Sequence, residues 1–369
     1  MAYCKYKLGD LVEQYDEINL NGEFADIDDL QGINSNKYFQ ECKSNKNDID
    51  LYRYRICRHG MFSYNRATSR NGEKISIALR TGGDCIVSPS YYCFRVKNED
   101  ILCPEYLDIW FKRPVFDRYA RFNSWGSATE FFTFDDFCTT EIMLPPISEQ
   151  RKIVHDYQVI TDRIELLRKM NEKLEEFLFA DFQRKFQNGK DAALKGTPLN
   201  GWKTCELAEL TDFQYGKMVP ENERSETGYP IFSGYGITGY YHEYMFEDPC
   251  IVVLARGVSG TGEVRISPKY SYITNLSIVL SLKDNDYFAY LYEYLAHDNL
   301  RALDSGSAQS MITIDSLNKY IVAVPSMDLA KEYNDAFSKM HVVIENNQNE
   351  IESLTRLSTV SLQHLVKGA

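Results

Sequence analysis

Residues 144–151, Leu144-Pro145-Pro146-Ile147-Ser148-Glu149-Gln150-Arg151, decide how the chain is organised, because they form the start of a long helix. Ser148 is placed to act as the N-cap, since its hydroxyl can accept a hydrogen bond from a free backbone N–H of the first turn. The two prolines keep the chain extended up to that cap. Arg151 stands where a full capping box needs Glu or Gln, but Glu149 and Gln150 still place an acid and an acceptor in the first turn.

Apolar residues recur after this start in alternating steps of four and three. This spacing is a heptad seam, which is typical of a coiled coil rather than of a helix with one broad buried face. The seam positions are Ile153, Tyr157, Ile160, Ile164, Leu167, Asn171, Leu174 and Leu178. No Gly or Pro interrupts residues 151–186. We therefore predict a coiled-coil helix; the alternative is a long helix on the surface of a globular domain.

A second copy of this stretch lies near the C-terminus, where Val324-Pro325-Ser326 repeats Leu144-Pro145-Pro146 at an offset of 180. Its seam positions are Phe337, Met340, Ile344, Asn347, Ile351, Leu354 and Ser358. Each seam thus carries one asparagine, Asn171 or Asn347. If the helices pair antiparallel with these two side chains opposite each other, the apolar positions face each other throughout. A buried Asn costs stability but selects one register, and we predict this pairing.

Length and composition set the class of protein. At 369 residues the chain should hold two or more domains. The nine cysteines form no Cys-x-x-Cys pair, which favours reduced thiols and a cytoplasmic location. We expect no membrane span, no signal peptide and no metal site. The net charge of −12 argues against a nonspecific binder of polyanions, although local basic patches remain compatible with it.

Residues 1–147 are predicted to form a mixed α+β domain, with a helix over residues 104–122. Residues 51–80 hold seven Lys and Arg against one Glu, a local excess of six positive charges. Within them a predicted strand delivers Asn65 and Arg66 to a polar loop that contains Arg70. Arg and Asn can make bidentate contacts with guanine and adenine edges. The alternative is an Arg-rich hairpin that is simply solvated.

The order of a globular domain followed by a long helix is then repeated along the chain. Residues 148–187 are the predicted central helix and residues 188–200, polar and rich in turn formers, are the predicted linker. A second domain spans residues 201–326 and a C-terminal helix residues 327–369. Landmarks such as Leu207-Ala208-Glu209-Leu210 match Leu8-Gly9-Asp10-Leu11, while loop lengths differ, so we infer an internal duplication. The glycine-rich loops of the second domain fit neither a P-loop nor a dinucleotide fingerprint. Glycine there lets the backbone approach a large ligand or makes tight turns.

With the repeat, the helices and their start in view, the whole chain resembles the specificity (S) subunit of type I restriction-modification systems. The most specific pieces are residues 144–151 and Gly306-Ser307-Ala308-Gln309. The resemblance implies two DNA target-recognition domains that read a bipartite, asymmetric double-stranded site, and two helices that act as spacer and docking platform. The chain itself would be non-catalytic. Two methyltransferase subunits would carry S-adenosylmethionine for adenine methylation, and restriction subunits, where present, would use ATP and Mg in defence against foreign DNA.

The second helix start departs from the family pattern, because Met327-Asp328-Leu329-Ala330 replaces the Ile-Ser-Glu-Gln run. The two starts are therefore not expected to make equal contacts. The candidate DNA-binding residues are Asn65, Arg66, Arg70, Lys217, Arg256 and Gln309, with Tyr64, Trp125 and Tyr235 as groove or sugar contacts. A helix of about 35 residues is about 50 Å long, enough to separate half-sites by about one DNA turn of roughly 34–36 Å.

Two rival functions were weighed. An enzyme acting alone is disfavoured, because the sequence lacks an Asn/Asp-Pro-Pro-aromatic motif and a cofactor-binding strand–turn–helix. A coiled-coil adaptor whose globular domains bind protein or glycan would suit the aromatic-rich loops. Salt dependence separates this rival from DNA binding, since phosphate contacts give a steep negative slope.

Overall fold

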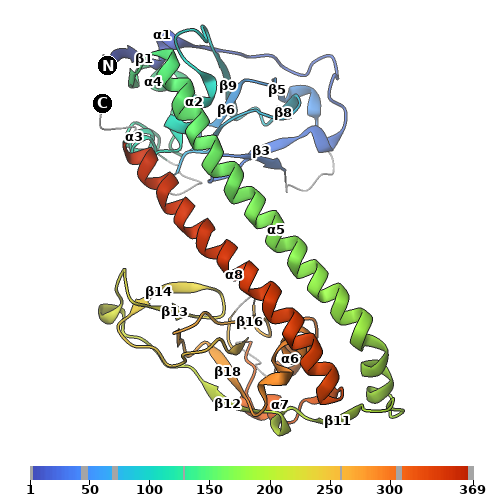
Figure 1. Ribbon diagram of the computed structural model, residues 1–369. Coiled ribbons are helices and arrows are strands. Elements are labelled where there is room, and N and C mark those ends of the chain that lie inside the picture. The colour runs from blue at the N-terminus through green and yellow to red at the C-terminus, as the bar shows by residue number, and fades with distance from the viewer. Residues whose placement is uncertain are drawn as a thin grey trace. The chain divides into compact units, whose positions relative to one another are not determined.

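The computed structural model describes residues 3–42, 49–68, 74–127, 129–257, 260–304 and 310–364 (Figure 1). The chain divides into two compact units. Unit 1 comprises Met1–Leu167 and Asn349–Ala369, and unit 2 comprises Arg168–Gln348. Each unit therefore combines one globular part with segments of two long helices.

The globular part of unit 1 is built on short strands. They are β1 (Cys4–Lys7), β2 (Val12–Gln14), β3 (Gln31–Ile33), β4 (Phe39–Glu41), β5 (Arg55–Cys57), β6 (Phe62–Asn65), β7 (Ile77–Leu79), β8 (Cys85–Val87), β9 (Tyr91–Val96) and β10 (Glu141–Leu144). The main sheet is antiparallel in the order β2-β9-β6-β7. Its aromatic residues suit a pleated, buried surface: the rings of Phe62 and Phe94 stack across β6 and β9 with centroids 5.0 Å apart.

The helices of unit 1 before residue 147 are α1 (Leu8–Leu11), α2 (Pro104–Phe111), α3 (Pro114–Phe122) and α4 (Phe134–Cys138). The prediction of one helix over residues 104–122 was wrong. Pro114 cannot continue a helix, because it lacks the backbone N–H and its ring clashes with the preceding turn. It instead occupies the first position of α3, where a missing N–H costs nothing.

The globular part of unit 2 repeats this plan with different loops. Its strands and helices are β11 (Lys203–Glu206), β12 (Thr211–Tyr215), β13 (Tyr229–Phe232), β14 (Ile237–Tyr241), β15 (Ile251–Leu254), β16 (Val264–Ile266), β17 (Tyr272–Ile273), β18 (Ser277–Leu282), α6 (Phe288–Ala296), α7 (Ile314–Asn318) and β19 (Ile321–Val324). The main sheet runs β12-β18-β15-β16, and a smaller sheet runs β14-β13-β17.

The two main sheets have the same topology, which confirms the predicted duplication of a mixed α/β domain. Each globular part also begins and ends in a two-stranded antiparallel ribbon, β1–β10 in unit 1 and β11–β19 in unit 2. Matching backbone bonds fix the correspondence between the units. The N–H of Leu8 donates to the Thr140 carbonyl at 2.9 Å, and the N–H of Leu207 donates to the Tyr320 carbonyl at 2.8 Å.

The two long helices are α5 (Ile147–Leu194) and α8 (Met327–His364). The linker predicted at residues 188–200 is wrong in its first half, because α5 continues to Leu194. Gly189 belongs to this helix for a packing reason: a Cβ there would lie 2.1 Å from the Trp202 ring. The glycine thus lets Trp202 pack directly on the helix backbone, and the nearby Ala193 is buried as well.

The helices run antiparallel within each unit, as the predicted fold class requires. In unit 2, Asn347 Nδ2 donates to Asn171 Oδ1 at 2.7 Å, and each residue is 9% exposed. Farther along α5, the Tyr333 hydroxyl donates to the Leu178 carbonyl at 3.0 Å. As the residue numbers rise along α5, those of the contacting α8 residues fall, so the two helices are antiparallel.

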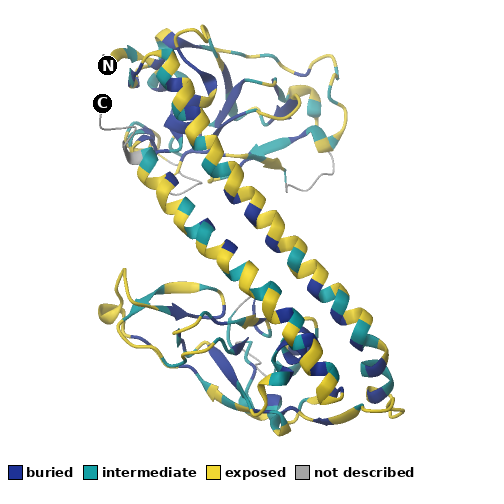
Figure 2. Ribbon diagram, viewed as in Figure 1, coloured by how far each residue is buried: buried dark blue, intermediate teal, exposed yellow. Residues whose placement is uncertain are grey.

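In unit 1 the same seam is apolar. Ile164 and Leu167 of α5 form one buried cluster with Ile351 of α8. Figure 2 shows the resulting pattern, in which buried positions recur along the otherwise exposed faces of α5 and α8. This pattern follows from a 3.5-residue repeat.

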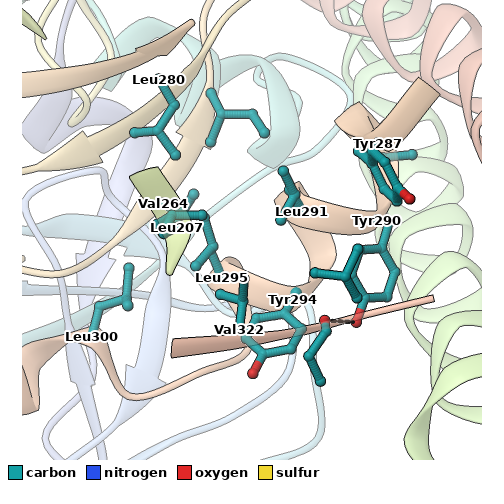
Figure 3. Close-up of a cluster of buried hydrophobic side chains, with 14 of the residues drawn as sticks. Leu207, Val264, Leu280, Tyr287, Tyr290, Leu291, Tyr294, Leu295, Leu300 and Val322 are labelled. Atoms are coloured by element: carbon teal, nitrogen blue, oxygen red, sulfur yellow. Dashed lines mark hydrogen bonds between the residues drawn. The ribbon is translucent and has the colours of Figure 1, made fainter. Parts of the chain in front are cut away.

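The largest buried cluster lies in unit 2, where α6 packs against the β11–β19 ribbon and the main sheet. Figure 3 shows Tyr287, Tyr290 and Tyr294 on and just before α6, together with Leu291 and Val322. The Tyr290 hydroxyl is satisfied inside this cluster, because it donates to the Ala323 carbonyl at 2.6 Å. The hydroxyl of a buried tyrosine usually has such a partner.

None of the helices in the described part of the chain is long and apolar enough to cross a membrane. Within the same described ranges, no three His, Cys, Asp or Glu side chains gather in a way that could hold a metal ion.

Candidate nucleic-acid interface

The first candidate surface lies where β6 ends in unit 1. Arg66 follows the strand with an exposed side chain. Its guanidinium carbon lies 5.3 Å from the centre of the Phe131 ring and 5.9 Å from that of Tyr92. Arg66 forms no ion pair with a carboxylate among the described residues, so its donors are available to a ligand.

Trp125 lies beside this arginine. The Trp125 N–H donates to the Phe131 carbonyl at 3.1 Å, and the Phe131 N–H donates back at 2.9 Å. Residue 67 pairs with Phe131 as well, so the two loops lie side by side. Trp125 is 68% exposed. The structure therefore brings together Arg66, Trp125 and Phe131 as one exposed surface with a cation and two aromatic rings, which we call the unit 1 surface.

Asn65, in contrast, shapes the turn that presents this surface. Its Oδ1 accepts a hydrogen bond from the Ala67 N–H at 3.1 Å, which is an Asx-turn. The amide is thus engaged within the protein, and its role in contacting a base stays a prediction.

Tyr64 was predicted to contact a groove, and the structure contradicts this. Its side chain is fully buried, stacks on Phe137 with centroids 5.3 Å apart, and donates to the Phe132 carbonyl at 3.3 Å. Both faces of a central strand such as β6 are covered, so alternation along the strand does not expose every second residue. Burial also raises the pKa of Tyr64 well above its usual range.

Part of the positive excess of residues 51–80 is neutralised by acids from elsewhere in unit 1. Arg55 pairs with Asp16, and Arg58 pairs with Glu17 at 2.7 Å and with Asp84 at 3.0 Å. Hydrogen bonds from Arg58 hold the pKa of the Glu17 carboxyl below its ordinary value. The sequence count therefore overstated the positive charge of this surface, since partners distant in sequence cannot be seen in a local count.

The second candidate surface lies in unit 2, where Arg256 follows β15. The Arg256 side chain is half-buried, and its Nε has no hydrogen-bond partner. Tyr235 packs on the loop after Arg256, because a Cβ at Gly257 would lie 1.8 Å from the Tyr235 hydroxyl. Gly257 also has φ +154, which favours glycine. Arg256 and Tyr235 together form the unit 2 surface.

Lys217 follows β12, and its side chain is exposed. Its backbone N–H donates to the Ile273 carbonyl at 2.9 Å, and the preceding Gly216 lies so close to the Thr274 carbonyl that a Cβ would come within 2.2 Å of it. The loop is therefore held tightly against its neighbour. The two other candidates, Arg70 and Gln309, lie outside the described residues.

Arg66 and Arg256 do not occupy equivalent positions. The Phe132 N–H donates to the Arg66 carbonyl, and the corresponding Ile312 N–H donates to the Ala255 carbonyl, each at 2.9 Å. The two arginines are therefore offset by one residue between the matching strands. Neighbouring residues of an extended strand point to opposite sides, which explains why Arg66 is exposed and Arg256 half-buried.

Sequence reasoning missed Phe131, which forms the middle of the unit 1 surface. A signal was present, because Phe131 and Phe132 are adjacent in an extended segment and only one of two neighbours can face the core. Phe132 is fully buried and Phe131 is partly exposed. Met218, next to Lys217, is a second exposed apolar residue that composition alone did not single out.

Comparison with known proteins adds the following. The model of the type I restriction modification DNA specificity domain matches residues 19–176 and again residues 200–356. No curated protein sequence matches the chain.

Among solved structures, the chain is similar to the S subunit of a type I restriction-modification system from M. genitalium. The two share 18% identity over 98% of this chain and 95% of that chain, with a TM-score of 0.64. The HsdS subunit from Thermoanaerobacter tengcongensis is 18% identical over 98% of this chain and 95% of that chain, with a TM-score of 0.37. The first of these similarities supports the fold, and the two family-model matches reproduce the duplication seen in the sheets.

Proposed function

The chain belongs to the type I restriction-modification DNA specificity family, and we propose that each unit recognises one half of a divided DNA site. The observation that carries this proposal is the duplicated sheet with a different surface at corresponding strand ends. One surface presents Arg66 with Phe131 and Trp125, and the other presents Arg256 with Tyr235. Because the surfaces differ, the two half-sites should differ in sequence.

The side-chain chemistry fits base recognition in duplex DNA. A guanidinium can donate two hydrogen bonds to the O6 and N7 atoms of guanine. Arg66 is free of carboxylate partners within the described ranges, and Arg256 leaves its Nε unbonded, so both retain donors for a base. The exposed Lys217 is a compact charge suited to a phosphate, which positions the protein without reading sequence.

We propose that partner subunits, and not this chain, carry out the chemical reactions on the DNA. Two methyltransferase subunits would bind S-adenosylmethionine and methylate adenine, and restriction subunits would use ATP and Mg. Methylation requires the base to leave the stack, so the units proposed here would hold the duplex while a partner receives the flipped base. The helix starts at Ile147 and Met327 carry different residues, so we propose that they dock the two methyltransferase subunits through unequal contacts.

The test of half-site recognition is genome-wide mapping of adenine methylation in the source cell with and without this chain. The proposal requires one bipartite, asymmetric motif that disappears on deletion. A motif that survives deletion, or a continuous palindromic motif, would contradict it.

A binding test assigns the residues. Arg66→Ala and Arg256→Ala should each weaken binding to the mapped site by about 1–3 kcal/mol and relax specificity in one half-site only. Lys217→Ala should weaken binding on all sequences and lower the salt slope by about one. Arg163→Ala is the matched control, since Arg163 is an exposed helix arginine paired with Glu350.

A further inference from the structure

A cavity of about 610 Å³ in unit 1 lies away from the residues proposed to read DNA. It is bounded by the β1–β10 ribbon and by the corner where α2 ends and α3 begins. The polar side chains around it are Lys5, Lys7, Arg113, Thr139, Thr140 and Glu141, and the aromatic ones are Trp110, Phe116 and Tyr119. This volume is within the range of roughly 300–1,000 Å³ that is usual for small-molecule sites.

The most unusual group in this cavity is the guanidinium of Arg113. The residue is only 4% exposed. Its Nε donates to the Trp110 carbonyl at 2.9 Å, and the guanidinium carbon lies 4.1 Å from the centre of the Trp110 ring. Across the described ranges, no carboxylate forms an ion pair with it. Burial lowers its pKa to about 10. A buried cation without a counterion is costly, and proteins normally provide one.

A second unpartnered group lines the same space. Thr140 is 2% exposed, and its hydroxyl has no hydrogen-bond partner. The rim adds Lys5 and Lys7, of which Lys5 is paired with Glu141 at 2.7 Å. The cavity therefore offers one buried cation and one free hydroxyl donor, and its rim holds two lysines and the Glu141 carboxylate, which is paired with Lys5. Two independent features, the uncompensated charge and the orphaned hydroxyl, indicate an acceptor that carries negative charge.

The equivalent place in unit 2 shows what such a space can hold. Matching backbone bonds put Tyr320 where unit 1 has Thr140. The Tyr320 hydroxyl donates to Asp298 Oδ2 at 2.7 Å. Lys190 lies 3.7 Å from the same carboxylate oxygen and 3.9 Å from the centre of the Tyr294 ring. Unit 2 thus supplies its own aromatic ring, carboxylate and cation.

Unit 1 has a cation at a different position, Arg113, and lacks the other two groups. The Tyr-Leu pair of α2 at residues 106–107 matches that of α6 at residues 290–291, so Arg113 corresponds to His297 and Pro114 to Asp298. Thr140 has no ring, so unit 1 lacks the aromatic group that Tyr320 supplies in unit 2. What is missing in unit 1 is therefore an aromatic body and an oxyanion.

We propose that this cavity binds a small organic anion, a carboxylate or phosphate attached to an aromatic or apolar body. Arg113 and Thr140 would donate to the oxyanion, and Trp110 and Tyr119 would contact the body. A DNA backbone phosphate is a poor candidate, because duplex DNA contacts groups at the surface whereas Arg113 is almost fully buried. The proposed site is independent of the proposed DNA recognition.

The test uses benzoate and phenyl phosphate as probes, with benzamide as the neutral isostere of benzoate and inorganic phosphate as the anion without a body. Binding to the full chain is measured by ligand-observed NMR and by Trp fluorescence. Benzoate should bind at least about tenfold more tightly than benzamide, a difference of roughly 1.4 kcal/mol. Phenyl phosphate should outcompete inorganic phosphate.

Two variants locate the site. Arg113→Met keeps the length of the side chain and removes the charge, and Thr140→Tyr fills the cavity as in unit 2. Each should weaken benzoate binding by at least about tenfold. Arg118→Met, an exposed arginine of α3 outside the cavity lining, is the control and should bind as the wild type does. If Arg113→Met does not fold, Thr140→Tyr alone decides the location.

Four outcomes would overturn the proposal. They are no saturable binding of either probe, equal binding of benzoate and benzamide, unchanged binding by Thr140→Tyr, and equal binding of inorganic and phenyl phosphate. The last would mean a site for free phosphate rather than for an organic anion.

Discussion

The starts of the two long helices are fixed to their globular parts in different ways. In unit 1, Gln150 is fully buried and makes three hydrogen bonds to backbone groups. Its Oε1 accepts from the Cys103 N–H at 3.0 Å, and its Nε2 donates to the carbonyls of Ile101 and Pro145, each at 2.9 Å. One side chain thus ties the strand end, the start of α2 and α5 together.

In unit 2 the equivalent position is Ala330, which is buried and has no polar side chain. Two other residues hydrogen-bond the backbone groups near this helix start. The Tyr287 hydroxyl donates to the Pro325 carbonyl at 3.2 Å, and Asn334 Oδ1, one helical turn after Ala330, accepts from the Ala289 N–H at 3.1 Å. The comparison teaches that the buried backbone groups need partners in both units, while the side chains that serve them are free to change.

The largest expected effect is at Gln150. Gln150→Ala should lower the free energy of unfolding of unit 1 by about 3–4 kcal/mol, because it leaves three buried backbone groups without partners. Urea unfolding followed by Trp fluorescence measures this, with Trp202→Phe in the background so that Trp110 and Trp125 report on unit 1 alone. If Gln150→Ala lowered the free energy of unfolding by less than Tyr287→Phe and Asn334→Ala do in unit 2, the two helix starts would be anchored with equal redundancy.

A second difference concerns a buried acid. Glu293 of α6 occupies the place of the buried Ile109 in α2, and burial, followed by the negative charge of Glu175, raises its pKa to about 7. The folded state then keeps a proton that the unfolded state has lost, so unit 2 should lose stability as pH rises from about 4.5 to about 7. At 1.36 kcal/mol per pKa unit the loss is about 3 kcal/mol.

Glu293→Gln should abolish most of this slope, and thermal unfolding from pH 4.5 to 8 measures it. His297 lies 3.2 Å from the Glu293 carboxylate, and burial lowers its pKa, so it contributes a slope of opposite sign in both proteins. Because the two groups are in contact, the difference between wild type and variant reports on the titration of the Glu293–His297 pair. If the stability of wild type and Glu293→Gln changed with pH in parallel, Glu293 would not be the buried carboxyl that titrates in this range.

The helix seam offers a third comparison, between the apolar layer of unit 1 and the Asn171–Asn347 pair of unit 2. Asn171→Leu alone should cost about 1–2 kcal/mol, because Asn347 loses its acceptor in a buried site. The double variant to Leu should recover that loss, since an apolar layer is more stable than an asparagine layer. Equal stability of the single and double variants in a double-mutant cycle would refute the coupling.

The smallest effects are expected at the divided anchor of unit 2. Tyr287→Phe and Asn334→Ala should each cost about 1 kcal/mol, the usual value of one hydrogen bond, in urea unfolding reported by Trp202. Their sum should remain below the loss from Gln150→Ala. Tyr292→Phe, a change of the same kind on α6, is a control for removing a hydroxyl elsewhere in this cluster.

Much of the fold could be predicted because its signals are local and periodic. The 3-4 spacing located both helices and both asparagines, and repeated landmarks revealed the duplication. The end of α5 could not be predicted, because Gly and the polar residues around it indicate a turn, and the packing of Trp202 on Gly189 joins residues distant in the local pattern.

The candidate surfaces were harder to predict, because they too depend on contacts between residues that are distant in sequence. Strand ends correctly pointed to Arg66 and Arg256 as loop residues, yet burial of Tyr64 and the ion pairs of Arg55 and Arg58 depend on residues distant in sequence. The one-residue shift between the arginines emerged only from backbone pairing. Local patterns thus identify segments, and tertiary contacts decide which side chains are free.

The two-stranded ribbons have a consequence for how such a protein can change. Cys4 faces Leu144 in one ribbon and Lys203 faces Val324 in the other, so each globular part enters and leaves through neighbouring strands. Everything between the two strands of a ribbon can be replaced as a cassette, by recombination or in the laboratory, while the junctions stay a strand's width apart. A chimera made at these positions in unit 1 would acquire a new ligand preference, and its inserted segment would have to supply the backbone partners that Ile101 and Cys103 give to Gln150.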